Sequence, residues 1–161
     1  TGDIESVFQK QLISEAAQSK KIEIIESGFT TETEISEAVM SLINKRVNGM
    51  FQIYDTFNEI SLPVLSKKCG DSKIPLFGYG HADRLEMGMT MTAERPYKDM
   101  GKIFAEMIIK ILKGEKPGNL PFLSNELFNS SLFINLDSAS ASGLIIPENI
   151  IKTAEKVITK K

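Results

Sequence analysis

Residues 48–79, NGMFQIYDTFNEISLPVLSKKCGDSKIPLFGY, decide the fold because they contain a strand, a helix and a second strand in succession. The strands are the apolar runs at 50–54 and 74–77, and the helical pattern between them runs from about residue 58 through Leu65 and begins or bends at Pro63. Consecutive strands joined by a helix lie parallel in one sheet, and such sheets carry helices on both faces. The stretch therefore predicts an α/β fold, a parallel sheet sandwiched by helices.

The same alternation continues toward the N-terminus. Apolar residues at three- and four-residue steps predict a first helix over 4–16, and IEIIE at 22–26 predicts a short strand. A second helix is expected over 35–43, because Thr31 and Glu34 form the T-x-x-E pattern of a capping box before it. The sequence therefore predicts that helices and strands alternate from the helix over 4–16 onward.

The clearest element of the C-terminal half is a helix over 96–112, with Gly114 where a left-handed C-cap belongs. Before it, three methionines alternate with Gly and Thr over 87–91, which predicts a strand whose methionines fill the core rather than bind a soft metal. The other expected elements are a loop at 116–118, a strand at 132–135, a short helical turn at 137–142 and a last helix from Pro147 through Val157.

Composition excludes several classes of function. Nineteen basic and twenty-one acidic residues give a net charge of −2, so no nucleic-acid partner is expected. No run approaches the ~20 apolar residues that span a bilayer, and Thr1-Gly2-Asp3 does not look like the start of a signal peptide. The single cysteine, Cys69, cannot form an internal disulfide and is expected to be an incidental surface thiol.

Catalytic motifs are mostly absent from the sequence. Gly78-Tyr79-Gly80 begins like a dinucleotide-binding fingerprint, but position 83 is Asp rather than Gly, so no cofactor is expected. His81 is the one histidine, which excludes a metal site built on paired imidazoles and leaves no ready nucleophile and base. His81 is then either a polar loop side chain or a ligand contact at a strand's carboxyl end. We expect no enzyme, no metal and no cofactor.

Asp55 follows the first strand of the opening stretch and precedes its helix. A carboxylate at this place could cap the helix, or it could accept hydrogen bonds from a ligand, because parallel sheets bind ligands at the carboxyl ends of their strands. The spacing does not choose between these two roles. The loops after Tyr54 and Phe77 are therefore the places where a ligand site is expected.

Several short stretches together resemble one known family. They are Y-D-T at 54–56 with L-P at 62–63, I-P-L-F at 74–77, Y-K-D-M-G at 97–101 leading into I-L-K-G-E-K-P at 111–117, and I-N-L at 134–136 with G-L-I-I-P at 143–147. The chain resembles the substrate-binding proteins of uncharacterised and aromatic-amino-acid-type ABC importers, which have the type I periplasmic binding protein fold. The resemblance covers essentially all 161 residues.

The resemblance implies that two α/β lobes close on a small ligand, and it assigns ligand-binding roles where motifs match. The matching positions are Tyr54, Asp55 and Thr56 in a loop that points into the cleft, Tyr79 and Gly80 in the next loop, Glu94 at a crossover between lobes, and Asp3 with Ser6 in the first loop of the C-terminal lobe. His81 is also assigned a ligand-binding role, although its loop differs from the family pattern. The chain has G-H-A-D-R at 80–84 where the family has a small or acidic loop with more glycine.

The function implied is capture of a small amino-acid or sugar-like molecule and its delivery to a membrane ABC permease, at the periplasmic or extracellular face of the cell membrane. An alternative is the ligand-sensing domain of a receptor or transcription regulator with the same fold. An upstream lipoprotein signal would favour the importer, and an upstream helix-turn-helix or membrane anchor would favour the sensor.

The resemblance also implies a division of the chain. Residues 1–86 would belong to the C-terminal lobe with its first strand missing, 87–118 would supply a strand and a helix of the N-terminal lobe, and 119–161 would hold a crossover and the C-terminal elements. The apolar face of the 96–112 helix would then lack its native partner. We expect it to be covered in a homodimer of this chain or to fold back onto the chain's own sheet.

Overall fold

The computed structural model describes residues 4–53, 58–95, 97–122 and 130–159. Within these ranges five strands form one sheet in the order β1-β2-β3-β4-β5. They are β1 (Met50–Gln52), β2 (Leu76–Tyr79), β3 (Met91–Glu94), β4 (Ser131–Asn135) and β5 (Lys156–Ile158). The first three strands are parallel, β4 runs antiparallel to β3, and β5 runs parallel to β4. The expected α/β class is confirmed, with one reversal of direction that the sequence did not predict.

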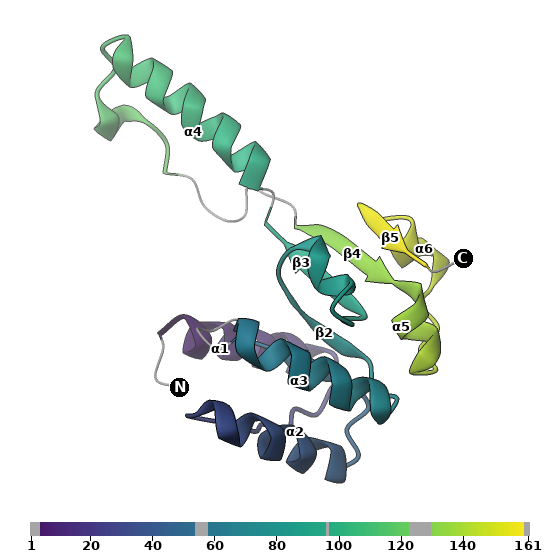
Figure 1. Cartoon of the computed structure of the whole chain (residues 1–161). Helices are drawn as coiled ribbons and strands as arrows, with labels where there is room; N and C mark the ends of the chain where they lie inside the picture. Colours follow the sequence, from purple (N-terminus) through teal and green to yellow (C-terminus); the bar gives the residue numbers. More distant parts are fainter. Residues whose placement is uncertain (1–3, 54–57, 96, 123–129, 160–161) are drawn as a thin grey trace.

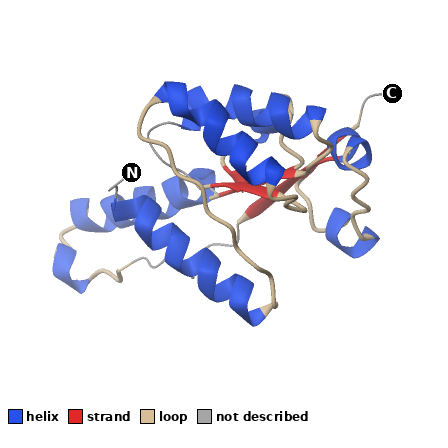
Figure 2. Cartoon of the chain, turned by 90° about the horizontal axis from the view of Figure 1, so that it is seen from below, coloured by secondary structure: helices blue, strands red, loops and turns tan. Residues whose placement is uncertain are grey.

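Helices flank the sheet, and the view from below shows the strands grouped between them (Figure 2). The α-helices are α1 (Ile4–Ser19), α2 (Ile35–Asn44), α3 (Asn58–Asp71), α4 (Tyr97–Leu112), α5 (Leu136–Ala141) and α6 (Glu148–Ile151). Short 3-10 helices occur at Glu32–Glu34, Ala82–Leu85 and Pro117–Asn119. The helices expected at 4–16, 35–43, 58–65 and 96–112 are therefore all present, and α3 extends six residues beyond its predicted end.

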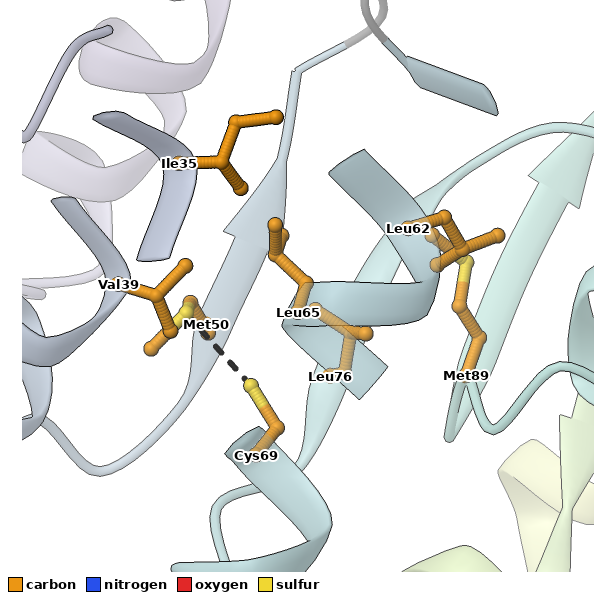
Figure 3. Packing of buried hydrophobic residues seen from close by; sticks show 8 residues of the cluster. All are labelled: Ile35, Val39, Met50, Leu62, Leu65, Cys69, Leu76 and Met89. Carbon is orange, nitrogen blue, oxygen red and sulfur yellow. Dashed lines mark hydrogen bonds between the residues drawn. The ribbon is translucent and has the colours of Figure 1, made fainter. Parts of the chain in front are cut away.

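The core lies where α2 and α3 pack on β1 and β2 (Figure 3). The apolar residues of α2 recur at helical spacing, which turns one face of the helix toward the sheet. The residues that form this cluster are Ile35, Val39, Met50, Leu62, Leu65, Cys69, Leu76 and Met89. The strand, the helix and the second strand of the opening stretch, β1, α3 and β2, thus contribute to one core, as that stretch predicts.

The capping box expected from Thr31 and Glu34 does not form, and Glu34 bonds Thr30 instead. The carboxylate of Glu34 accepts hydrogen bonds from the backbone N–H of Thr30 at 2.7 Å and from the Thr30 hydroxyl at 3.0 Å. Thr31 makes no side-chain cap bond, and its hydroxyl lies 3.0 Å from that of Thr33. The bonds from Thr30 lower the pKa of Glu34 because they favour its charged form.

Cys69 is buried, so the expectation of a surface thiol was wrong. It lies on the sheet-facing side of α3, and its thiol contacts the sulfur of Met50 at 3.6 Å. Burial raises the pKa of Cys69 to about 11, because an apolar environment disfavours the thiolate.

We therefore expect Cys69 to resist alkylation by iodoacetamide at pH 8 while the protein is folded. The thiolate is the reacting form, and the raised pKa makes it about 100-fold rarer than at the reference value, before access is considered. Mass spectrometry of the time course would measure this, with the same protein in denaturant as the control. Equal alkylation rates in the folded and denatured protein would contradict the buried position.

The strand expected at 22–26 was wrong. These residues form no regular element, although they follow α1 directly. A strand exists through its hydrogen bonds to a neighbouring strand, and no strand among the described residues pairs with this stretch. Local β-propensity alone therefore gave the wrong assignment.

The strand expected at 87–91 was also wrong, and β3 begins where it was expected to end. Gly88 has φ +103 and sits in a turn whose backbone bonds run from Gly88 to Leu85 (3.1 Å) and from Met89 to Arg84 (3.1 Å). Of the three methionines of this stretch, Met89 is buried and Met87 is exposed. The methionines therefore do not share one face of a strand, and the predicted core stripe reduces to Met89.

The last helix ends earlier than expected. Bonds from Thr153 to Ile150 and from Ala154 to Ile151 close the helical turn, and the backbone N–H of Glu155 then donates to Leu132 at 2.8 Å. The chain continues as β5 beside β4. Val157, expected in the helix, is part of that edge strand.

Two expectations about the 87–118 segment meet different outcomes. β3 pairs with β2 on one side and β4 on the other, so residues 91–94 share a sheet with the elements from which the expected division separated them. Helix α4 instead extends away from the sheet (Figure 1), and it has no buried residue. Folding back of its apolar face onto the chain's own sheet is therefore wrong, whereas the dimer and the lobe boundaries stay predictions.

Candidate functional site

The carboxyl ends of β1, β2 and β3 lie along one edge of the sheet, because the three strands are parallel and in register. Gln52 stands beside Gly78, and Tyr79 stands beside Ala93. The residues that follow β2, and the last residue of β3, Glu94, therefore emerge next to each other. Ligands of open α/β sheets bind at such an edge.

A turn at Gly80 fastens the loop after β2 to β3. The backbone N–H of Gly80 donates to Ala93 at 2.8 Å, and the hydroxyl of Thr92 donates to the Gly80 carbonyl at 2.9 Å. Gly80 has φ +147, and a Cβ added there would lie 2.2 Å from Nε of Arg84, which is itself buried. The position therefore requires glycine both for its backbone and for the space that the Arg84 side chain fills.

Gly80→Ala should destabilise the protein by about 1–3 kcal/mol, the range for a residue held in a disfavoured backbone region. Displacement of the buried Arg84 side chain adds to this cost. Urea unfolding measures the change. Gly101→Ala in α4 is the matched control, since a Cβ there meets nothing within 4 Å and Ala favours a helix. An equal loss in both variants would show that the Gly80 turn has no special role.

The turn brings His81 against Glu94. Nδ1 of His81 lies 2.6 Å from Oε1 of Glu94, with the histidine side chain 65% exposed and the glutamate side chain 18% exposed. The His81 ring also lies beside the ring of Tyr97, with centroids 6.0 Å apart and planes at 40°. A polar pair therefore links the ends of β2 and β3 at the carboxyl edge of the sheet.

Tyr79 adds a buried hydroxyl to this edge. No described residue meets its oxygen at hydrogen-bond geometry. Burial raises the pKa of Tyr79, while the charge and N–H groups of nearby Arg95 oppose that rise. The Tyr79 hydroxyl is thus a protonated, buried donor that lies near the cationic side chain of Arg95.

Comparison with known proteins gives the family. The family model described as "ABC transporter substrate binding protein" matches residues 2–158. This chain belongs to that family. The resemblance seen in the sequence motifs is therefore confirmed over nearly the whole chain.

Individual relatives agree with this assignment. The chain is 25% identical over 141 residues to a tyrosine-binding protein of Clostridioides difficile, covering 88% of this chain and 40% of that protein. A ligand-free, open structure of a substrate-binding protein with adhesive properties from Clostridium difficile is 26% identical, with a TM-score of 0.76 and coverage of 99% and 52%. The chain thus spans about half of that structure and two fifths of the curated relative.

One more solved structure shares the fold. An ABC domain from Streptococcus pneumonia, in complex with L-Trp, has a TM-score of 0.72 at 23% identity, covering 95% of this chain and 52% of that one. At this identity the likeness supports the fold alone. The expected type of architecture is therefore found in proteins of distant sequence.

The structure places only part of the site expected from the sequence. Tyr79, Gly80, His81 and Glu94 lie together at the carboxyl edge, as described above. Ser6 lies half-buried in the first turn of α1 and stays a prediction. Four other expected residues, Asp3, Tyr54, Asp55 and Thr56, lie outside the described residues, and the cleft-facing role of Asp55 stays a prediction with them.

Sequence reasoning missed three residues at this edge: Arg84, Arg95 and Tyr97. Arg84 fills the space under Gly80, Arg95 lies near the Tyr79 hydroxyl, and Tyr97 contacts the His81 ring. A glycine four residues before an arginine carries no signal of such packing. The run E-R-P-Y at 94–97 could have been found as a second polar loop, had β3 been placed at its true position.

One depression on the described surface lies elsewhere. It has a volume of about 480 Å³ and is lined by residues that follow α2, α3 and α5, such as Arg46, Lys73 and Gly143. Asn48 and Pro75, which precede β1 and β2, also line it, so it opens at the amino edge of the sheet. It does not touch Tyr79 or the other residues of the carboxyl edge, and we do not assign the ligand to it.

Two features are absent from the described residues. No three His, Cys, Asp or Glu side chains gather there in a group that could hold a metal ion. In the same part of the chain, no helix is both long and apolar enough to cross a membrane.

Proposed function

We propose that this chain is part of the solute-binding component of an ABC importer, which captures an amino acid between two lobes and delivers it to a membrane permease. The observation that supports this most directly is the family match over residues 2–158. The group at the carboxyl edge, Tyr79, Gly80, His81 and Glu94, would form one side of the ligand cleft. The component would act outside the cell membrane or in the periplasm.

The ligand class we propose is an amino acid with an aromatic side chain. One relative is a tyrosine-binding protein, and one structural neighbour is a complex with L-Trp. The edge of the sheet here carries aromatic rings in Tyr79, Tyr97 and His81. Each favourable ring pair adds about 0.5–1.5 kcal/mol beyond the burial of apolar area, so such an edge suits an aromatic ligand.

The proposed mechanism is reversible capture without covalent chemistry. The ligand enters while the lobes are apart, polar groups from both sides satisfy its charged ends, and hinge closure presents a surface to the permease. We place α4 in the second lobe, because it extends from the sheet and carries an apolar face that the described chain leaves uncovered. The His81–Glu94 pair at the carboxyl edge would bind and orient the ligand rather than move protons in a reaction.

Thermal unfolding of the full-length protein with a panel of solutes tests this proposal. L-tyrosine or L-tryptophan at a hundred times its dissociation constant should add about 2.7 kcal/mol of stability. Glucose and L-lysine serve as controls for a sugar and for a cationic amino acid, and neither should stabilise the protein to this extent. Stabilisation by glucose alone would contradict the amino-acid assignment.

A further inference from the structure

We infer that the carboxylate of Glu94 binds the α-ammonium group of the ligand and that His81 is the positioning residue that holds this carboxylate in place. This inference rests on the proposed capture of an amino acid. It assigns separate roles to two residues that the resemblance only counts as ligand-binding, Glu94 at a crossover between lobes and His81 in the loop at 80–84.

The carboxylate of Glu94 has one oxygen that no described residue binds. Its side chain is 18% exposed, and one of its oxygens, Oε1, is engaged by His81 at 2.6 Å. No other described residue donates a hydrogen bond or forms an ion pair with this carboxylate. Oε2 is not among the fully buried polar atoms that lack a partner, so it stays accessible from outside the sheet. A ligand's ammonium group, which carries three donors, can therefore reach this oxygen.

His81 contacts Glu94 through its Nδ1 nitrogen. A contact of 2.6 Å between Nδ1 and a carboxylate oxygen requires a proton on Nδ1, since two lone pairs would otherwise repel each other. That nitrogen is thus occupied by Glu94. Tyr97 lies beside the imidazole ring, with centroids 6.0 Å apart. His81 therefore fixes the orientation of Glu94, while most of its own surface faces solvent.

The His81–Glu94 pair lies where β2 and β3 end. Glu94 ends β3, and the turn at Gly80 is tied to β3 by two hydrogen bonds of 2.8 and 2.9 Å. Both members of the pair are thus held by the sheet rather than by a free loop. A rigid carboxylate at the carboxyl edge suits recognition of a small charged group.

The test compares two pairs of probes by calorimetry on the full-length protein. L-tyrosine is compared with 3-(4-hydroxyphenyl)propionate, and L-tryptophan with indole-3-propionate, so that each pair differs by the ammonium group. Glu94→Gln should weaken binding of the amino acid about 10- to 150-fold, the range for a hydrogen bond to a charged group, and leave the des-amino analogue nearly unchanged. Glu86→Gln, an exposed carboxylate in the preceding loop, is the matched control and should bind both as wild type.

His81→Ala separates positioning from a general structural role. It should weaken amino-acid binding several-fold in the wild-type background and have no further effect in the Glu94→Gln background, because its action runs through Glu94. Additive losses in the double variant would overturn the positioning role.

The outcomes also separate this inference from the proposed function. Wild-type affinity in Glu94→Gln, or an equal loss for the amino acid and its des-amino analogue, would overturn the inference while the capture function stands. A wild-type protein that binds none of the four probes would overturn both.

Discussion

Ile134→Ala should lower the free energy of unfolding by about 2–5 kcal/mol, the range for truncation of a fully buried isoleucine. Ile134 lies in β4 with no exposed surface, between Met91 of β3 and Val157 of β5. Its removal leaves a cavity where the sheet changes from parallel to antiparallel. Urea or thermal unfolding gives the value.

The control for this variant is Ile145→Ala, which changes the same residue type at a position that is 89% exposed. That substitution should alter stability by less than about 0.5 kcal/mol. Losses of equal size at both positions would contradict the packing around β4.

Ile108→Lys should weaken self-association of the 161-residue chain by at least about tenfold. Ile108 is 56% exposed on the apolar face of α4, beside the exposed side chain of Phe104. Burial of such a side chain contributes about 1.5–3 kcal/mol, so an uncovered face of this kind favours association with a second copy. Sedimentation velocity at micromolar concentrations measures the assembly.

Glu106→Lys, which places a lysine elsewhere on the same exposed helix, is the matched control and should leave the association unchanged. A wild-type chain that sediments as a folded monomer at these concentrations would show that the apolar face needs no second copy. In the full-length protein the same face would be covered by the second lobe, so association should be a property of the shorter chain.

The helices could be predicted from the sequence because their signal is local. In α2 and α4, apolar residues repeat within one turn and a cap or glycine marks an end, so neither depends on distant parts of the chain. The strands at 22–26 and 87–91 failed for the opposite reason. Whether an extended run becomes a strand depends on hydrogen bonds to a neighbouring strand. The second run makes a turn at Gly88, before the residues that pair with a neighbouring strand.

The candidate site shows the same division. The sequence places Tyr79 and His81 after a strand, and the structure confirms that this strand ends at the edge with Glu94. The contact between His81 and Glu94 could not be predicted, because it depends on the register of β2 against β3 and on the Gly80 turn over Arg84. Spacing along the chain contains neither quantity.

Isothermal titration calorimetry of the full-length protein with L-tyrosine and L-tryptophan, followed by chromatography of the recovered ligand, tests the central claim most directly. The account predicts saturable heat with one ligand per protein and recovery of that ligand unaltered. A folded protein that gives no heat with any amino acid, or one that returns a chemically changed ligand, would contradict it.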